Sequence, residues 1–88
     1  MVRQEPFEQG NLYGVHIYFD EVDDVLPLHT HPAGSAHITF VRRGRLLIIH
    51  PRGDHRIVEP GALLKFDPGE EHGYRALWPN SKITNVIY

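Results

Sequence analysis

Short apolar runs rich in aromatic and β-branched residues recur along the chain, separated by polar breaks. Runs of this length and composition are typical of β-strands. They cover residues 12–20, 36–41, 46–50, 56–59, 62–66, 73–78 and 83–88. No segment shows a sustained helical period of apolar residues. The pattern therefore predicts an all-β protein.

The breaks between these runs contain residues that suit tight turns. The chain has 8 glycines and 7 prolines, spread along it and not gathered in one linker. Proline presets φ near about −65°, and glycine accepts positive φ. Many short strands joined by such turns favour an antiparallel sandwich or barrel.

The length of the chain predicts a single domain. At 88 residues it has about the minimum needed for one hydrophobic core, and it shows no internal repeat or low-complexity tract. We expect residues 12–88 to form one β-barrel domain. We expect residues 1–11 to be an N-terminal arm or an exchanged edge strand.

Composition excludes several classes of protein. Hydrophobic residues make up 41% of the chain and charged residues 23%, as in ordinary folded proteins. The formal net charge of −2 provides no basic surface for nucleic acid, and no segment approaches the roughly 20 apolar residues of a membrane span. We therefore expect a cytoplasmic protein with neither nucleic acid nor membrane as a partner.

Histidine is the unusual residue, with 7 copies in 88 positions. His29 and His31 share one face of an extended chain, about 6.5 to 7 Å apart. His37 follows a turn at residues 32–35, and His72 follows a second turn at residues 67–69. A hairpin and a barrel bring such positions together, so these four side chains are candidate metal ligands.

Imidazole suits zinc, copper, iron and nickel, and the absence of cysteine leaves only nitrogen and oxygen ligands. The alternative is that His29 and His31 are simply polar residues on an exposed strand face. Surface or supporting roles are expected for the three histidines outside this pattern, which are His16, His50 and His55.

The spacing of these residues resembles the two motifs of the cupin family. His29-Thr30-His31 matches the H-x-H of the first motif, and His37 stands where the family usually has a glutamate ligand. The second motif starts at Gly61, continues through Asp67-Pro68-Gly69 and reaches His72. Together the two motifs span roughly residues 23 to 76.

The chain departs from the family pattern without losing a ligand. Asp23 replaces the first glycine, Asp67 replaces a proline, Ala76 replaces the final asparagine, and five residues separate His31 from His37. The resemblance implies one divalent transition metal ion, which is iron, manganese, nickel, zinc or copper. Its ligands are His29, His31, His37 and His72. The alternatives are a metal-free relative, or a His37 that turns away and leaves three ligands or is replaced by Glu70 or Glu71.

Four neutral ligands leave the charge of the ion uncompensated by protein. That favours an anionic ligand or hydroxide at an open position. The resemblance also implies a double-stranded β-helix, the cupin-like jelly roll, with the ion at its mouth and a pocket beside it. Candidate substrate-binding residues are Thr39, Phe40, Phe66, Tyr74 and Trp78. The alternative for each is ordinary core packing.

The leading functional hypothesis is a metal-dependent enzyme of the cupin type, an oxygenase-like oxidoreductase that acts on a small organic molecule. No residue is assigned as general acid or base. One alternative is a non-catalytic module that binds or senses a small molecule through its metal. Another is a sugar-modifying or isomerase cupin, which is less favoured because such sites often retain the carboxylate ligand.

A homodimer is the expected assembly. Sheet edges in a small open sandwich need cover, and residues 1–11 or the terminal run 83–88 can pair across a two-fold axis.

Overall fold

The structure is a computed structural model that describes residues 1–30, 37–53, 55–67 and 69–87. Within these residues the chain forms a series of β-strands. In order they are β1 (Val2–Gln9), β2 (Leu12–Phe19), β3 (Val25–His29), β4 (His37–Arg43), β5 (Leu46–Ile49), β6 (Arg56–Val58), β7 (Leu63–Phe66), β8 (His72–Ala76) and β9 (Ser81–Ile87).

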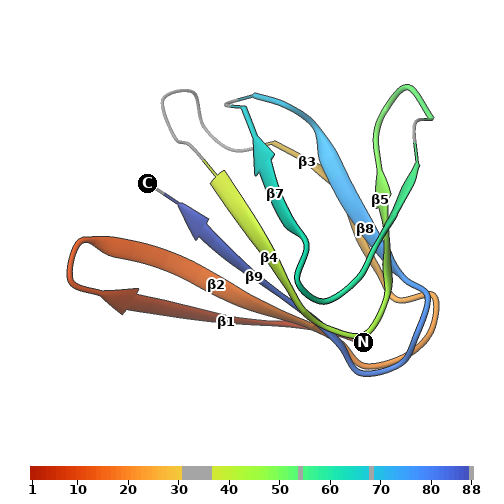
Figure 1. The fold of residues 1–88 in the computed structure, drawn as a ribbon, viewed down its shortest axis with the longest axis horizontal. Helices are drawn as coiled ribbons and strands as arrows, with labels where there is room; N and C mark the ends of the chain where they lie inside the picture. Colours follow the sequence, from red (N-terminus) through yellow and green to blue (C-terminus); the bar gives the residue numbers. More distant parts are fainter. Residues whose placement is uncertain (31–36, 54, 68, 88) are drawn as a thin grey trace.

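The strands form two antiparallel sheets that face each other (Figure 1). The order is β1-β2-β9-β4-β7 in the larger sheet and β3-β8-β5-β6 in the smaller one. The described residues include no helix, and so none that could span a membrane. The prediction of an all-β antiparallel barrel of the double-stranded β-helix type is confirmed.

Residues 1–11 were expected to be an arm or an exchanged edge strand, and β3 was not predicted from the sequence. Strand β1 lies within residues 1–11 and pairs with β2 of the same chain, from Val2 opposite Phe19 to Gln9 opposite Leu12. Its side chains are mostly polar and exposed, so backbone pairing defines it and no apolar alternation reveals it. Strand β3 contains Pro27, and its register with β8 shifts between Leu26 and His29.

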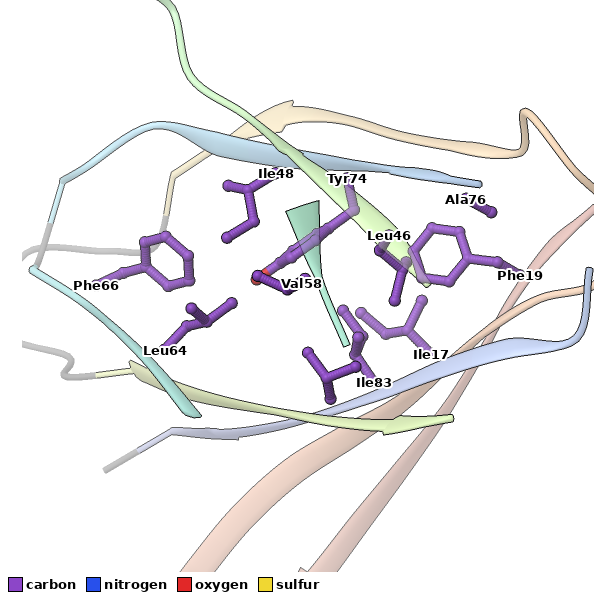
Figure 2. Close-up of a cluster of buried hydrophobic side chains, with 11 residues drawn as sticks. Ile17, Phe19, Leu46, Ile48, Val58, Leu64, Phe66, Tyr74, Ala76 and Ile83 are labelled. Atoms are coloured by element: carbon purple, nitrogen blue, oxygen red, sulfur yellow. The ribbon is translucent and has the colours of Figure 1, made fainter. Parts of the chain in front are cut away.

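Period-two alternation decides which side chains enter the space between the sheets. In β4, for example, His37, Thr39 and Val41 are buried and the residues between them are partly exposed, as the sequence predicts. Figure 2 shows the core side chains that meet between the sheets, with Phe66 at one end and Phe19 at the other. Full burial of each large apolar side chain stabilises the fold by about 1.5–3 kcal/mol.

The connection from β4 to β5 passes between the sheets through a crowded turn. Gly44 has a φ of +85°, a region that side-chain-bearing residues rarely adopt. A Cβ atom at this position would lie 2.7 Å from the Cα of Ser81. The Ser81 hydroxyl donates to the carbonyl oxygen of Trp78 at 2.9 Å and accepts from the Arg45 amide at 3.2 Å. Gly44 and Ser81 therefore pack closely at this end of the barrel.

Candidate functional site

Three histidines that are far apart in sequence meet at one end of the barrel. His29 ends β3, His72 begins β8, and the two are direct partners across the ladder. His37 begins β4 in the opposite sheet (Figure 1). The ring centres of His29 and His72 are 4.6 Å apart, and those of His37 and His72 are 5.1 Å apart. The topology thus gathers three of the four predicted ligands.

The fourth predicted ligand, His31, lies outside the described residues. Of the other three, His72 and His37 are fully buried, and His29 is partly exposed. Glu70, one of the alternative ligands, is partly buried, and its Oε1 accepts a hydrogen bond from the Asp67 amide at 3.2 Å. The other alternative, Glu71, is exposed.

Backbone carbonyl groups fix which ring nitrogen carries the proton in two of these histidines. The Nδ1 of His29 lies 2.8 Å from the Pro27 carbonyl oxygen, and the Nδ1 of His72 lies 3.1 Å from that of Glu70. A carbonyl oxygen only accepts, so each Nδ1 donates its hydrogen. In the neutral ring the Nε2 atom then holds the lone pair, as a metal ligand requires.

A buried polar network gives His37 the opposite tautomer. The Thr39 hydroxyl donates its one hydrogen to Asn85 Oδ1 at 2.7 Å and accepts from the Tyr74 hydroxyl at 3.2 Å. His37 Nε2 lies 3.1 Å from the same hydroxyl oxygen, so it must be the donor. The neutral His37 ring therefore carries its lone pair on Nδ1.

Tyr74 supports this network as a neutral hydrogen-bond donor. Burial raises the pKa of its hydroxyl well above the ordinary value, and the hydrogen bond to Thr39 opposes the shift only in part. The side chain is fully buried among the core residues (Figure 2). Tyr74 therefore keeps its proton at physiological pH.

The ring separations fit the binding of one transition metal ion. Metal–nitrogen bonds measure about 2.0–2.1 Å, so two rings bound to one ion at ordinary angles have centres about 4.5 to 5.2 Å apart. The separations of 4.6 and 5.1 Å fall in this range. Among the described residues, however, no group of three or more His, Asp or Glu side chains is already arranged to hold an ion. The ring separations therefore fit a shared ion for two pairs, His29 with His72 and His37 with His72.

Phe66 forms the inner wall of the histidine cluster. Its ring stacks on His72 with centres 3.8 Å apart and an interplanar angle of 12°, and it lies 5.5 Å from the His37 ring. Phe66 faces His37 across the ladder between β7 and β4. An aromatic wall limits access of water to the imidazoles and restricts their rotation.

The residues predicted to bind substrate fall into two groups. Thr39, Phe66 and Tyr74 are buried beside the histidine cluster. Phe40 lies on the other face of β4 from His37, next to Arg42. Trp78 follows the far end of β8 and is 55% exposed, because the strand ends at Ala76 and the chain turns there. The structure therefore does not bring Phe40 and Trp78 to the cluster.

Asn85 was not identified from the sequence. It is buried and stands opposite Thr39 in the ladder between β9 and β4. The signal that could have found it is an amide side chain at an inward position of the alternating strand, in phase with Ile83. A buried amide needs hydrogen-bond partners, and the Thr39 hydroxyl is one of them.

Comparison with known proteins identifies the family. The model of the Cupin domain family matches residues 17–79. The chain belongs to this family. The match runs from the end of β2 through β8 and includes all three described histidines of the cluster. In this cupin domain the His37 ring lies in the cluster beside His72.

Solved structures share the fold at low sequence identity. An RmlC-like cupin protein from Desulfovibrio desulfuricans has a TM-score of 0.86 at 22% identity, covering 98% of this chain and 80% of that one. KdgF from Halomonas sp. has a TM-score of 0.82 at 23% identity, with coverage of 98% and 78%.

A third solved structure has a nearly equal length. The Cupin_2 domain of an XRE family transcriptional regulator from Enterobacter cloacae has a TM-score of 0.82 at 18% identity, covering 99% of this chain and 95% of that one. The search of curated proteins found no significant match. At these identities the comparisons support the fold, and the chemistry has to be argued from the site itself.

Three further histidines lie outside the two sequence motifs. His16 stacks on Phe7 with ring centres 4.6 Å apart, and its Nδ1 is 2.9 Å from the Thr84 hydroxyl. His50 and His55 stand on either side of the β5–β6 connection. The expectation of surface or supporting roles stays a prediction for all three.

Proposed function

We propose that this cupin domain binds one divalent transition metal ion through His29, His37 and His72, with His31 as the fourth ligand. The observation that carries the proposal is the pair formed by His29 and His72. Their ring centres are 4.6 Å apart, and each donates its Nδ1 hydrogen to a backbone carbonyl. Such an outer hydrogen bond orients a ligating histidine and raises its basicity.

The ion would supply Lewis acidity or redox chemistry to a small organic molecule. The described ligands are neutral, so an anionic group or hydroxide is the favoured partner of the ion. The protein contributes a dry inner wall, formed by Phe66 and the buried network below His37. We propose that the activity is oxygenase-like, since four imidazoles accept iron, copper, manganese and nickel as well as zinc.

A non-catalytic sensing module is the second candidate. It is favoured by the near-complete mutual coverage with the Cupin_2 domain of an XRE family transcriptional regulator. In that case the metal would hold a small molecule without consuming it. The cupin fold hosts many functions, so the two candidates have to be separated by experiment.

The test is metal titration of protein stripped with a chelator, followed by oxygen-uptake measurements on the loaded protein. We expect one ion per chain by calorimetry for at least one of zinc, iron, manganese, nickel and copper. Failure of all five to bind would contradict the metal-binding proposal. With a panel of small carboxylic acids, oxygen uptake above that of free metal supports the enzyme, and stoichiometric binding without uptake supports the sensing module.

A further inference from the structure

A cavity of about 400 Å³ opens on the side of the barrel, where the two sheets are not joined. Strand β6 is the edge of the smaller sheet and β7 is the edge of the larger one. The two edges flank this cavity instead of pairing with each other. Its lining residues are Ile48, His50, His55, Arg56, Leu63, Leu64, Lys65 and Phe66. The volume is within the range of about 300–1,000 Å³ that is usual for small-molecule sites.

The inner wall of this seam cavity is apolar. Ile48, Leu64 and Phe66 are each at most 5% exposed and belong to the hydrophobic core. Figure 2 shows the three side chains together at the same end of the core. Leu63, at 57% exposure, extends the apolar surface toward the solvent. A ligand with an apolar body would bury these groups further and gain about 25 cal/mol for each Å² removed from water.

The polar part of the lining is cationic. Arg56 and Lys65 are the cationic side chains of the lining, and His50 and His55 add imidazole groups. The described residues that line the cavity include no carboxylate. The charge of the described cavity lining is therefore positive, whereas the formal net charge of the whole chain is −2.

These two cations are not neutralised by the described part of the protein. The ion pairs found there use Arg3, Arg45 and Arg75 as side-chain cations. Neither Arg56 nor Lys65 takes part in an ion pair or in a side-chain hydrogen bond among the described residues. Both side chains are exposed, so they can move to meet a ligand.

Two other cavities in the described residues have a different lining. One of about 460 Å³ is lined by His50 and Arg52 but also by Glu70 and Glu71. Another, of about 380 Å³, is mainly apolar and includes His29 but no arginine or lysine. A third, of about 360 Å³, has one cation, Arg42, beside Phe40 and Val41. The cavity between β6 and β7 combines a buried apolar wall with two cations, Arg56 and Lys65.

We propose that this seam cavity binds a small organic anion with an apolar body, such as an aryl or short-chain carboxylate. The carboxylate is held by Arg56 and Lys65, and the apolar body lies on Leu63, Leu64 and Phe66. The site uses none of the predicted metal ligands, so it does not depend on the proposed metal. Phe66 is shared between the two sites because its ring also stacks on His72.

The test is an NMR titration of metal-stripped protein with benzoate, compared with benzyl alcohol as the uncharged probe. We expect benzoate to shift the methyl signals of Ile48, Leu63 and Leu64 in a saturable manner. Benzyl alcohol should bind at least about tenfold more weakly, because it cannot form charge-assisted hydrogen bonds to the cations. The His72 ring signals should shift as well, through its contact with Phe66.

Two double variants with the same change in charge provide the comparison. Arg56→Gln with Lys65→Gln should weaken benzoate binding by about tenfold or more and leave binding of benzyl alcohol within about twofold. Arg42→Gln with Arg52→Gln removes two exposed cations outside the cavity lining and should leave benzoate binding within about twofold. All four residues are exposed, and the dispersion of the spectrum checks that both variants are folded.

Three results would overturn the proposal. They are the absence of saturable benzoate shifts, shifts confined to residues other than the cavity lining and His72, and unchanged affinity in the Arg56 and Lys65 variant. Because the NMR titration uses metal-stripped protein, its result can be interpreted even if the metal titration fails. Failure here likewise leaves the metal-binding proposal untouched.

Discussion

Replacing His72 with alanine is expected to abolish stoichiometric metal binding. His72 is the residue that contacts both other described histidines of the cluster, at ring separations of 4.6 and 5.1 Å. Its loss removes one ligand and the shared neighbour that holds the other two together. Loss even of outer hydrogen-bond partners of metal ligands costs about 10–100-fold in affinity, so we expect a loss of at least about 100-fold. The zinc affinity is measured by calorimetric titration, and the metal content of the dialysed protein by elemental analysis.

His16→Ala is the matched control for this substitution. His16 is partly buried and, like His72, contacts an aromatic ring, that of Phe7, but it lies on β2 away from the cluster. We expect this variant to bind about one equivalent, like the wild type. Circular dichroism verifies that both variants are folded. Equal metal content in His72→Ala and the wild type would place the ion elsewhere and contradict the assignment.

Replacing Gly44 with alanine is expected to cause a large loss of stability. A Cβ at this position meets the Ser81 Cα at 2.7 Å, and that backbone cannot withdraw without disturbing the start of β9. The positive φ adds about 1–2 kcal/mol of its own. With overpacking worth typically about 1–3 kcal/mol, the free energy of unfolding should fall by about 2–5 kcal/mol. Urea denaturation followed by circular dichroism measures this loss.

Gly53→Ala separates crowding from backbone conformation. Gly53 has a φ of +79°, close to that of Gly44, but no heavy atom lies within 4 Å of a Cβ built there. Only the cost of the positive φ applies, so we expect the free energy of unfolding to fall by about 1–2 kcal/mol. If the two variants lose the same stability, the close packing of Gly44 against Ser81 is not what holds this end of the barrel.

Alternation and turn residues predicted most of the strands because both signals are local. Strand β4, for example, buries His37, Thr39 and Val41 in the expected phase. Strand β3 carries no such signal, since Pro27 interrupts it and most of its side chains are exposed. Such a strand forms because a neighbour, here β8, offers backbone partners, and that information is not contained in its own sequence.

The histidine cluster was predictable because its spacing follows the two motifs of a family. The orientation of each ring was not, since it depends on the carbonyl groups of Pro27 and Glu70 and on the Thr39 hydroxyl. The prediction that Trp78 lines the pocket assumed that β8 continues in phase, whereas the strand ends at Ala76. Contacts between elements decide these details.

The seam cavity also could not be predicted from the sequence. His55 and Arg56 lie about ten positions from Lys65, and nothing local indicates that β6 and β7 become facing edges of different sheets. The cationic rim is therefore a product of the topology. Sequence reasoning reached only the expectation that a bound ligand is anionic.

The most direct test of the central claim is anomalous diffraction from crystals soaked in a zinc salt, recorded on both sides of the zinc absorption edge. The account predicts one strong anomalous peak among the clustered histidines, at about 2.0–2.1 Å from Nε2 of both His29 and His72. A peak found only at other residues, such as His50 or His55, would contradict the account. So would the absence of a peak at the cluster when titration in solution shows that the protein is saturated with zinc.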